Sequence, residues 1–301
     1  MRNCGVVLQV TEFINNVTDE LMRFSNLGSG PTRDDVRKTY LRDLCLTFSV
    51  LRPQMEILSD VPFLLKENDH MTRSRYPVLP GPNLLTSAAA VGKFEALHHF
   101  IAQGADPLGY TAGIITTPIK AAAVCGHTPM VCKLVEIARL DFHTLEERER
   151  DWILFTFETA QCHAIKAGDA ESLRLLLEFF VAHRNTSIPK MWPKMISEAA
   201  KNGKTETLVT LLKDIIPKST ERGHQSDLQE TWKESCKAGH AELVRRLLGD
   251  EFALVKRDPI IQKVSLEAAR FGHGGLVELL KGYGAHIESQ HLVQAITAFP
   301  D

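Results

Sequence analysis

The sequence contains no long apolar run and no excess of either charge. Its 301 residues never place eighteen apolar residues in succession, so no membrane-spanning helix is expected. With 35 basic and 37 acidic residues, the net charge of -2 offers no global attraction to nucleic acid or to an anionic membrane. Arg2 occupies the position where N-myristoylation needs glycine, and a cleavage site of small residues is missing, so neither a lipid anchor nor a leader peptide is expected.

Cysteine is sparse, and catalytic motifs are missing. The six cysteines form no CxxC pair, which argues against a zinc site and against a disulfide framework. Reduced thiols favour a cytoplasmic or nuclear location. The sequence has no GxSxG, no phosphate-binding GxxxxGK[ST] and no HExxH. We therefore expect no catalytic residue, no metal site and no cofactor.

One phrase recurs six times along the chain. It consists of a mostly small pair of residues, two variable residues, a glycine, a polar residue and an apolar helix. The glycines follow one another at 33 to 36 residues, apart from one gap of 42, which indicates a repeat protein. The phrase's glycines are Gly92, Gly126, Gly168, Gly203, Gly239 and Gly272.

Each residue type in the phrase has a physical reason. Glycine tolerates the positive φ that a tight turn between two helices needs. The apolar residues after it fall three and four apart, as in Leu243, Val244, Leu247 and Leu248, and form one stripe on the second helix. Because one pair of helices cannot bury that stripe alone, the units are expected to stack.

The phrase resembles the ankyrin repeat. TTPIKAAAVCGHTPMVCKLV, from Thr116, is similar to the family pattern T-P-L-H-x-A-A-x-x-G-H-x-x-V-V-x-x-L-L, with Thr117, Pro118, Gly126 and His127 at matching places. Tetratricopeptide and HEAT-like helix pairs are the competing interpretation, because a period of 34 is also found there. The T-P start and the G-H step favour ankyrin. The resemblance implies an all-α solenoid of stacked helix–turn–helix repeats with an N-terminal helical cap, covering roughly residues 82 to 300.

The middle of the array departs from the family pattern. The 42-residue gap holds an insertion near residues 143–157, around LEERERDWILFTF. One interpretation extends the first helix of the third copy, so that Trp152, Leu154, Phe155 and Phe157 lie partly in the core. The other makes this segment an exposed aromatic anchor for a partner.

Residues 1–80 precede the array and lack the phrase. Helical spacing predicts one helix from Val6 to Phe24 and a second from Val36 to Leu51, with Thr32 and Asp35 resembling a capping box. A third helix is expected over residues 54–67, and a truncated seventh unit over residues 290–297. The segment is expected to cap the array of residues 81–301; a separate helical module that recruits a partner is the alternative.

The two variable residues before each glycine are the candidate partner-binding positions. In ankyrin repeats they lie towards the concave groove where partners are held. The first of the pair is basic in the last four copies and apolar in the first two, which predicts a groove that is basic at one end and apolar at the other. The candidate residues are Lys166, Lys201, Lys237, Arg270, Val91, Cys125 and Phe271.

These observations predict a non-enzymatic protein–protein interaction module, such as an adaptor, a scaffold or a regulatory protein. Its expected partner is a protein, with an acidic surface that suits the basic positions. A transcription co-regulator that works through a protein partner is one alternative, since nothing indicates direct contact with nucleic acid. An enzyme on a degenerate ankyrin frame, with a pocket at the N-terminal helices, is the other.

Overall fold

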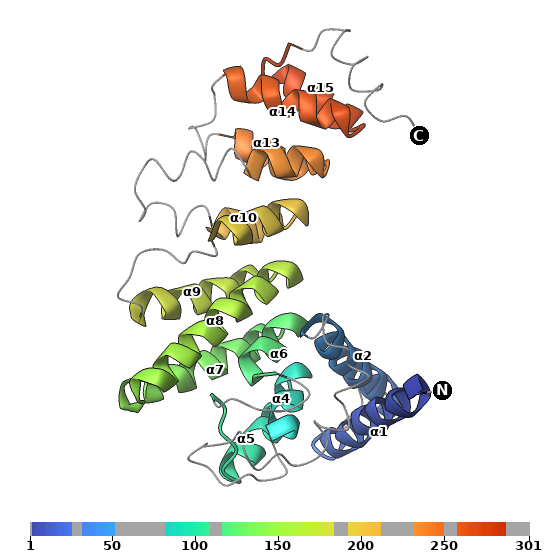
Figure 1. Ribbon diagram of the computed structural model, residues 1–301, viewed down its shortest axis with the longest axis vertical. Helices are drawn as coiled ribbons and strands as arrows, with labels where there is room; N and C mark the ends of the chain where they lie inside the picture. The colour runs from blue at the N-terminus through green and yellow to red at the C-terminus, as the bar shows by residue number, and fades with distance from the viewer. Residues whose placement is uncertain are drawn as a thin grey trace. The chain divides into compact units, whose positions relative to one another are not determined.

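Every regular element in the described part of the chain is a helix. The computed structural model describes residues 2–25, 32–51, 82–108, 116–183, 192–211, 231–249 and 258–286 (Figure 1). The chain divides into two compact units, residues 1–185 and residues 186–301. The helix expected over residues 54–67 and the seventh unit expected over residues 290–297 lie outside the described residues.

Two helices precede the repeats, as the sequence predicts. They are α1 (Arg2–Met22) and α2 (Arg33–Leu51). Thr32 and Asp35 form the expected capping box, in which the Asp35 amide donates to Thr32 Oγ1 at 3.2 Å and the Thr32 amide donates to Asp35 Oδ2 at 3.3 Å. Arg37 of α2 joins the two helices by donating to Asp19 Oδ1 at 3.2 Å and to Asn15 Oδ1 at 3.0 Å.

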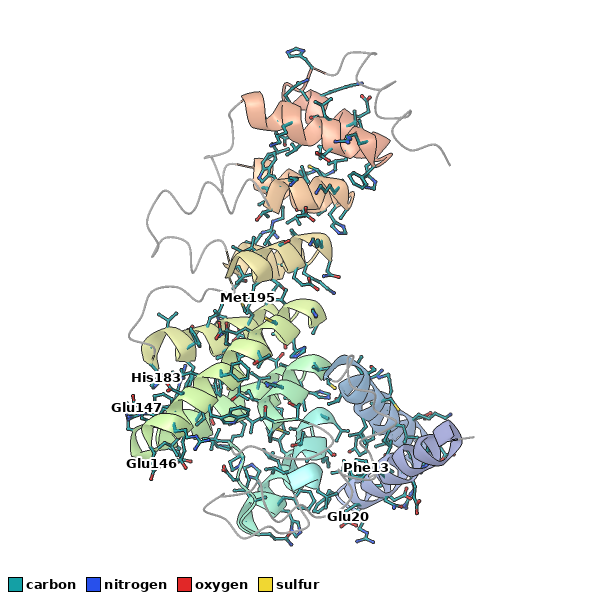
Figure 2. All side chains as sticks on the ribbon, viewed as in Figure 1. Phe13, Glu20, Glu146, Glu147, His183 and Met195 are labelled. Carbon is teal, nitrogen blue, oxygen red and sulfur yellow. The ribbon has the colours of Figure 1, made fainter. Side chains whose placement is uncertain are left out.

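The first unit contains three helix–turn–helix repeats. They are α4 (Pro82–Ala90) with α5 (Phe94–Ala102), α6 (Pro118–Cys125) with α7 (Thr128–Asp141), and α8 (Glu147–Ala167) with α9 (Ala170–His183). The first helices pack in sequence, α4 on α6 and α6 on α8, and α7 packs on α9. In Figure 2, Glu146 and Glu147 before and at the start of α8 and His183 at the end of α9 lie at one end of this antiparallel pair.

The second unit contains the other three repeats. They are α10 (Trp192–Lys201) with α11 (Thr205–Thr210), the helix over residues 231–237 with α13 (Ala241–Leu248), and α14 (Asp258–Arg270) with α15 (Gly274–Gly282). The four apolar residues predicted to form a stripe on α13 are all buried. The all-α, ankyrin-like stacking predicted from the sequence is thus confirmed within each unit.

The turn of every repeat uses its glycine in the left-handed conformation. All six predicted glycines have φ between 63° and 81°. In the second unit the histidine of the next repeat lies over this glycine and crosses to the preceding repeat. The Nε2–H of His240 donates to the Lys201 carbonyl at 2.8 Å, and that of His273 donates to the Lys237 carbonyl at 2.7 Å. These bonds give the turn histidines the structural role that the repeat pattern suggests.

The third repeat has an aspartate in place of the histidine. Asp169 caps α9, because its Oδ1 accepts from the Ser172 amide at 3.0 Å. Its Oδ2 also accepts from the Thr128 hydroxyl of the second repeat at 2.7 Å. A carboxylate therefore joins the second and third repeats, whereas an imidazole joins the fourth to the fifth and the fifth to the sixth.

A methyl group at Gly239 is expected to destabilise the second unit more than one at Gly272. Both glycines have positive φ, which costs an alanine about 1–2 kcal/mol. A Cβ at Gly239 would also lie 2.6 Å from His273 Nδ1, whereas no atom of the described residues lies within 4 Å of a Cβ at Gly272. Urea unfolding followed by circular dichroism should show Gly239→Ala to be less stable than Gly272→Ala by about a further 1–3 kcal/mol. Equal losses would contradict this account of the turn.

Candidate protein-binding surfaces

The residue pair before each turn glycine differs sharply between the early and the late repeats. Val91 is only 7% exposed and Val124 only 8%, so residues of the pair are buried in the first two repeats. The pairs of the other four repeats are exposed, apart from the half-buried Lys237. Those pairs are Lys166 with Ala167, Lys201 with Asn202, Lys237 with Ala238, and Arg270 with Phe271.

The N-terminal helices cover the pair in the first two repeats. Both α1 and α2 pack against α4, and α2 also packs against α6. The thiol of Cys125 lies 3.2 Å from Thr47 Oγ1 and donates to the Asp43 carbonyl at 3.5 Å. Burial raises the pKa of Cys125 to about 11, so the thiol keeps its proton. Val91 and Cys125, which the sequence assigned to a partner, lie here against other parts of the same chain.

The basic positions of the second unit are paired with glutamates. Glu234 accepts from Lys237 Nζ at 2.9 Å and lies 3.7 Å from Lys201 Nζ. Partial burial acts to raise the pKa of Glu234, but the hydrogen bond from Lys237 and the charges of both lysines outweigh it and lower the pKa. Arg270 likewise lies 3.7 Å from Glu267. We name these five residues the charged strip: Lys201, Glu234, Lys237, Glu267 and Arg270.

The carboxylates of the charged strip were missed in the sequence, although a signal for them exists. Each glutamate stands three residues before its cation, at the spacing that places two side chains on one face of a helix. The pattern recurs as Glu198 before Lys201, Glu234 before Lys237 and Glu267 before Arg270. The strip therefore presents alternating charges rather than a uniformly basic surface.

The insertion in the third repeat forms the first three turns of α8. Helix α8 has 21 residues, whereas α6 has eight, and Glu146 and Glu149 form a capping box at the start of α8. Phe157 is buried against Phe179, with ring centroids 4.3 Å apart, whereas Phe155 is 53% exposed. An extended helix thus places one aromatic residue in the core and another at the surface, so each interpretation of this segment describes part of it.

Phe155 lies in a cluster that α6 and α8 build together. Lys120 Nζ of α6 lies 5.3 Å from the centre of the Phe155 ring, a cation–π contact, and Trp152 lies one turn before Phe155 at 5.7 Å. Further along α8, His163 is half-buried near Lys120 and Lys166. Burial, followed by the charges of Lys166 and Lys120, lowers the pKa of His163 to about 4.

The described residues bring no metal site together. No three histidine, cysteine, aspartate or glutamate side chains of that part of the chain could share an ion. His98 is exposed, and His99 lies 3.0 Å from Gln103 Nε2 and packs on Phe24 at 5.1 Å. Within the described ranges, no helix is long and apolar enough to cross a membrane.

The repeat geometry defines an ankyrin-like repeat protein. The two-helix unit, the left-handed turn glycine and the histidine that crosses to the preceding repeat are the observations behind this class. No protein-family model matches the sequence, and no curated protein matches it. Among 18 matching chains of solved structures is the crystal structure of the human ASB11 ankyrin repeat domain. It is 20% identical, with a TM-score of 0.45, and the alignment covers 72% of this chain and 98% of that one.

The lowered pKa of His163 predicts a loss of stability in mild acid. In the unfolded chain the imidazole takes up its proton near pH 6.5, whereas in the folded chain it does so only near pH 4. The unfolded state therefore binds more protons between these values, and stability falls as the pH drops from 6.5 to 4. Urea unfolding at pH 7 and pH 4.5 should show a decrease for wild type that exceeds that of His163→Gln by on the order of 2 kcal/mol.

The exposed His98 provides the control for this measurement. His98→Gln removes an imidazole from the same unit without removing a buried one, so its loss between the two pH values should equal that of the wild type. If His163→Gln also behaves as the wild type does, the burial of His163 has no effect on acid stability.

Proposed function

We propose that this chain is a non-enzymatic protein-interaction module, in the role of an adaptor, a scaffold or a regulatory protein. The observation that carries the proposal is the exposed aromatic ring of Phe155, with the Lys120 cation against it, on helical turns that only the third of the three repeats of the first unit possesses. The cluster of Lys120, Trp152, Phe155 and Lys166 is the proposed docking surface of the first unit.

The chemistry of this surface selects its partner. An exposed phenyl ring beside an indole supplies rigid apolar area, of the kind that provides a large share of binding energy at interfaces. Lys120 is partly desolvated, and burial lowers its pKa, so a carboxylate placed beside it would relieve an unfavourable environment. A partner with an apolar side chain flanked by a carboxylate fits both features.

The charged strip is a second proposed surface, in the other unit. Its cations are paired with Glu234 and Glu267, so a uniformly acidic partner must compete with these carboxylates. Exposed ion pairs are worth no more than about 1 kcal/mol, which makes such competition feasible. Phe271, which is also exposed, adds an apolar contact at the end of the strip.

The proposed location is cytoplasmic or nuclear. None of the cysteine side chains that the structure describes takes part in a disulfide, as expected of a protein that works in a reducing compartment. No lipid or secreted partner is part of the proposal.

Capture experiments on the full-length chain test the first surface. The wild type, Phe155→Ala and Val181→Ala are immobilised, and the proteins they retain from a lysate of the source organism are quantified by mass spectrometry. Val181 is 50% exposed on α9, which makes it a matched control for Phe155 at 53%. Phe155→Ala should lower the retained amount of the main partner at least tenfold, or about 1.4 kcal/mol, because it removes the apolar anchor. Retention equal to that of Val181→Ala would refute the docking surface on α8.

Charge reversal tests the charged strip separately. The double variant Lys201→Glu, Lys237→Glu places two more carboxylates beside Glu234 and should weaken capture several-fold, with the larger loss at low salt. Lys263→Glu, at an exposed position of α14, is the control and should leave capture unchanged. If the double variant and the control retain the same proteins in the same amounts, the strip has no part in binding.

A further inference from the structure

The helix α2 presents one narrow face to the rest of the first unit. Among its described side chains, the buried ones are spaced three, one and three apart, whereas Thr39, Cys45 and Ser49 are exposed. The spacing i, i+3, i+4, i+7 is that of an amphipathic helix lying in a groove. The residues of this face are Tyr40, Asp43, Leu44 and Thr47.

The receiving side of the contact is the edge of the first two repeats. Cys125 and His127 of this edge lie against Thr47 and Asp43 of α2. Ala90, Val91 and Val124, which precede the turn glycines, are buried. The later repeats have lysine, arginine or other exposed residues at the same positions. The apolar pairs therefore occur in the two repeats whose first helices, α4 and α6, pack against α2. We name this edge the helix seat: Ala90, Val91, Val124, Cys125 and His127.

The polar contacts in the helix seat are incompletely satisfied. Asp43 is 3% exposed, and its Oδ2 lies 3.5 Å from His127 Nε2, yet neither atom has a hydrogen-bond partner among the described residues. Asp43 Oδ1 accepts from Arg42 Nε at 2.9 Å. A buried carboxylate with an unsatisfied oxygen costs free energy. The unsatisfied oxygen of Asp43 therefore lowers the free energy gained when α2 packs on the repeats.

We propose that the helix seat is a binding site for an amphipathic helix carrying an aromatic residue, aspartate, leucine and threonine at i, i+3, i+4 and i+7. In this structure α2 occupies the site from within the chain, and a partner helix of the same pattern displaces it. The site extends the proposed function, because none of its residues belongs to the docking surface around Phe155 or to the charged strip.

Covalent attachment sets the strength that a displacing helix needs. A tethered helix competes at an effective concentration in the millimolar range. A partner helix must therefore bind the vacant seat tightly enough to overcome this advantage, and any substitution that weakens α2 raises the apparent affinity of a competitor.

The probe for the test is a labelled synthetic peptide of residues 32–51 with Cys45 replaced by serine. Its binding to the full-length chain is measured by fluorescence anisotropy, with Cys45→Ser also present in the chain. Asp43→Lys in the chain replaces the buried carboxylate opposite His127 with a longer cation that the site cannot hold, and thereby displaces α2. The wild-type peptide should therefore bind this variant at least tenfold more tightly than it binds the unsubstituted chain. A peptide carrying Asp43→Lys should bind neither chain.

A disulfide lock provides a test that does not depend on eviction. Because Thr47 Oγ1 lies 3.2 Å from Cys125 Sγ, Thr47→Cys is positioned to form a disulfide with Cys125. Peptide binding should fall at least tenfold when this variant is oxidised and should return when it is reduced. The same molecule thereby serves as its own control, even if Asp43→Lys does not fold.

Equal peptide binding by the oxidised and reduced forms of Thr47→Cys would overturn the proposal, as would failure of the peptide to bind the reduced form at all. In either case α2 is a permanent part of the first unit. That result would leave the docking surface on α8 unaffected, because the Phe155→Ala capture experiment tests a residue outside the helix seat. If Phe155→Ala retained as much partner as its control, the peptide-binding test of the helix seat would in turn be unaffected.

Discussion

A glycine without a side chain, covered by an imidazole from the next repeat, is the contact that links the successive repeats of the second unit. The left-handed turn brings the backbone of one repeat within reach of the next, and only hydrogen at the α-carbon leaves room for the ring. The ring then donates to a carbonyl two residues before the glycine, at Lys201 and again at Lys237. Burial of the apolar stripes supplies most of the stability, and this bond links the fourth repeat to the fifth and the fifth to the sixth.

The third repeat shows how this scheme tolerates change. Asp169 replaces the imidazole and joins its neighbour through the Thr128 hydroxyl instead of through a backbone carbonyl. The same repeat carries the long helix α8, whose extra turns are anchored by Phe157 in the core. The most irregular repeat in sequence thus also presents the aromatic ring of Phe155 to solvent.

The fold could be predicted from the sequence because its signal is periodic. The six glycines, the apolar stripes and the Thr32 capping box are local patterns, and each appears in the structure where it was expected. The surfaces were less predictable because their character depends on contacts distant in sequence. Nothing near Cys125 in the sequence indicates that Thr47 and Asp43 of α2 lie against it. The ion pairs of Lys237 and Arg270 with glutamates could have been predicted, since each glutamate stands three residues before its cation in the sequence.

The apolar edge of the first two repeats also determines how such a chain can grow. A duplicate of the fourth or fifth repeat would carry an exposed, charged edge and could join the array without further change. A duplicate of the first or second would carry alanine and valine at the same positions, with no second copy of α2 to shield them, and would expose a sticky surface. Lengthening of this array in evolution is therefore one-ended, because the N-terminal helices fix where it starts.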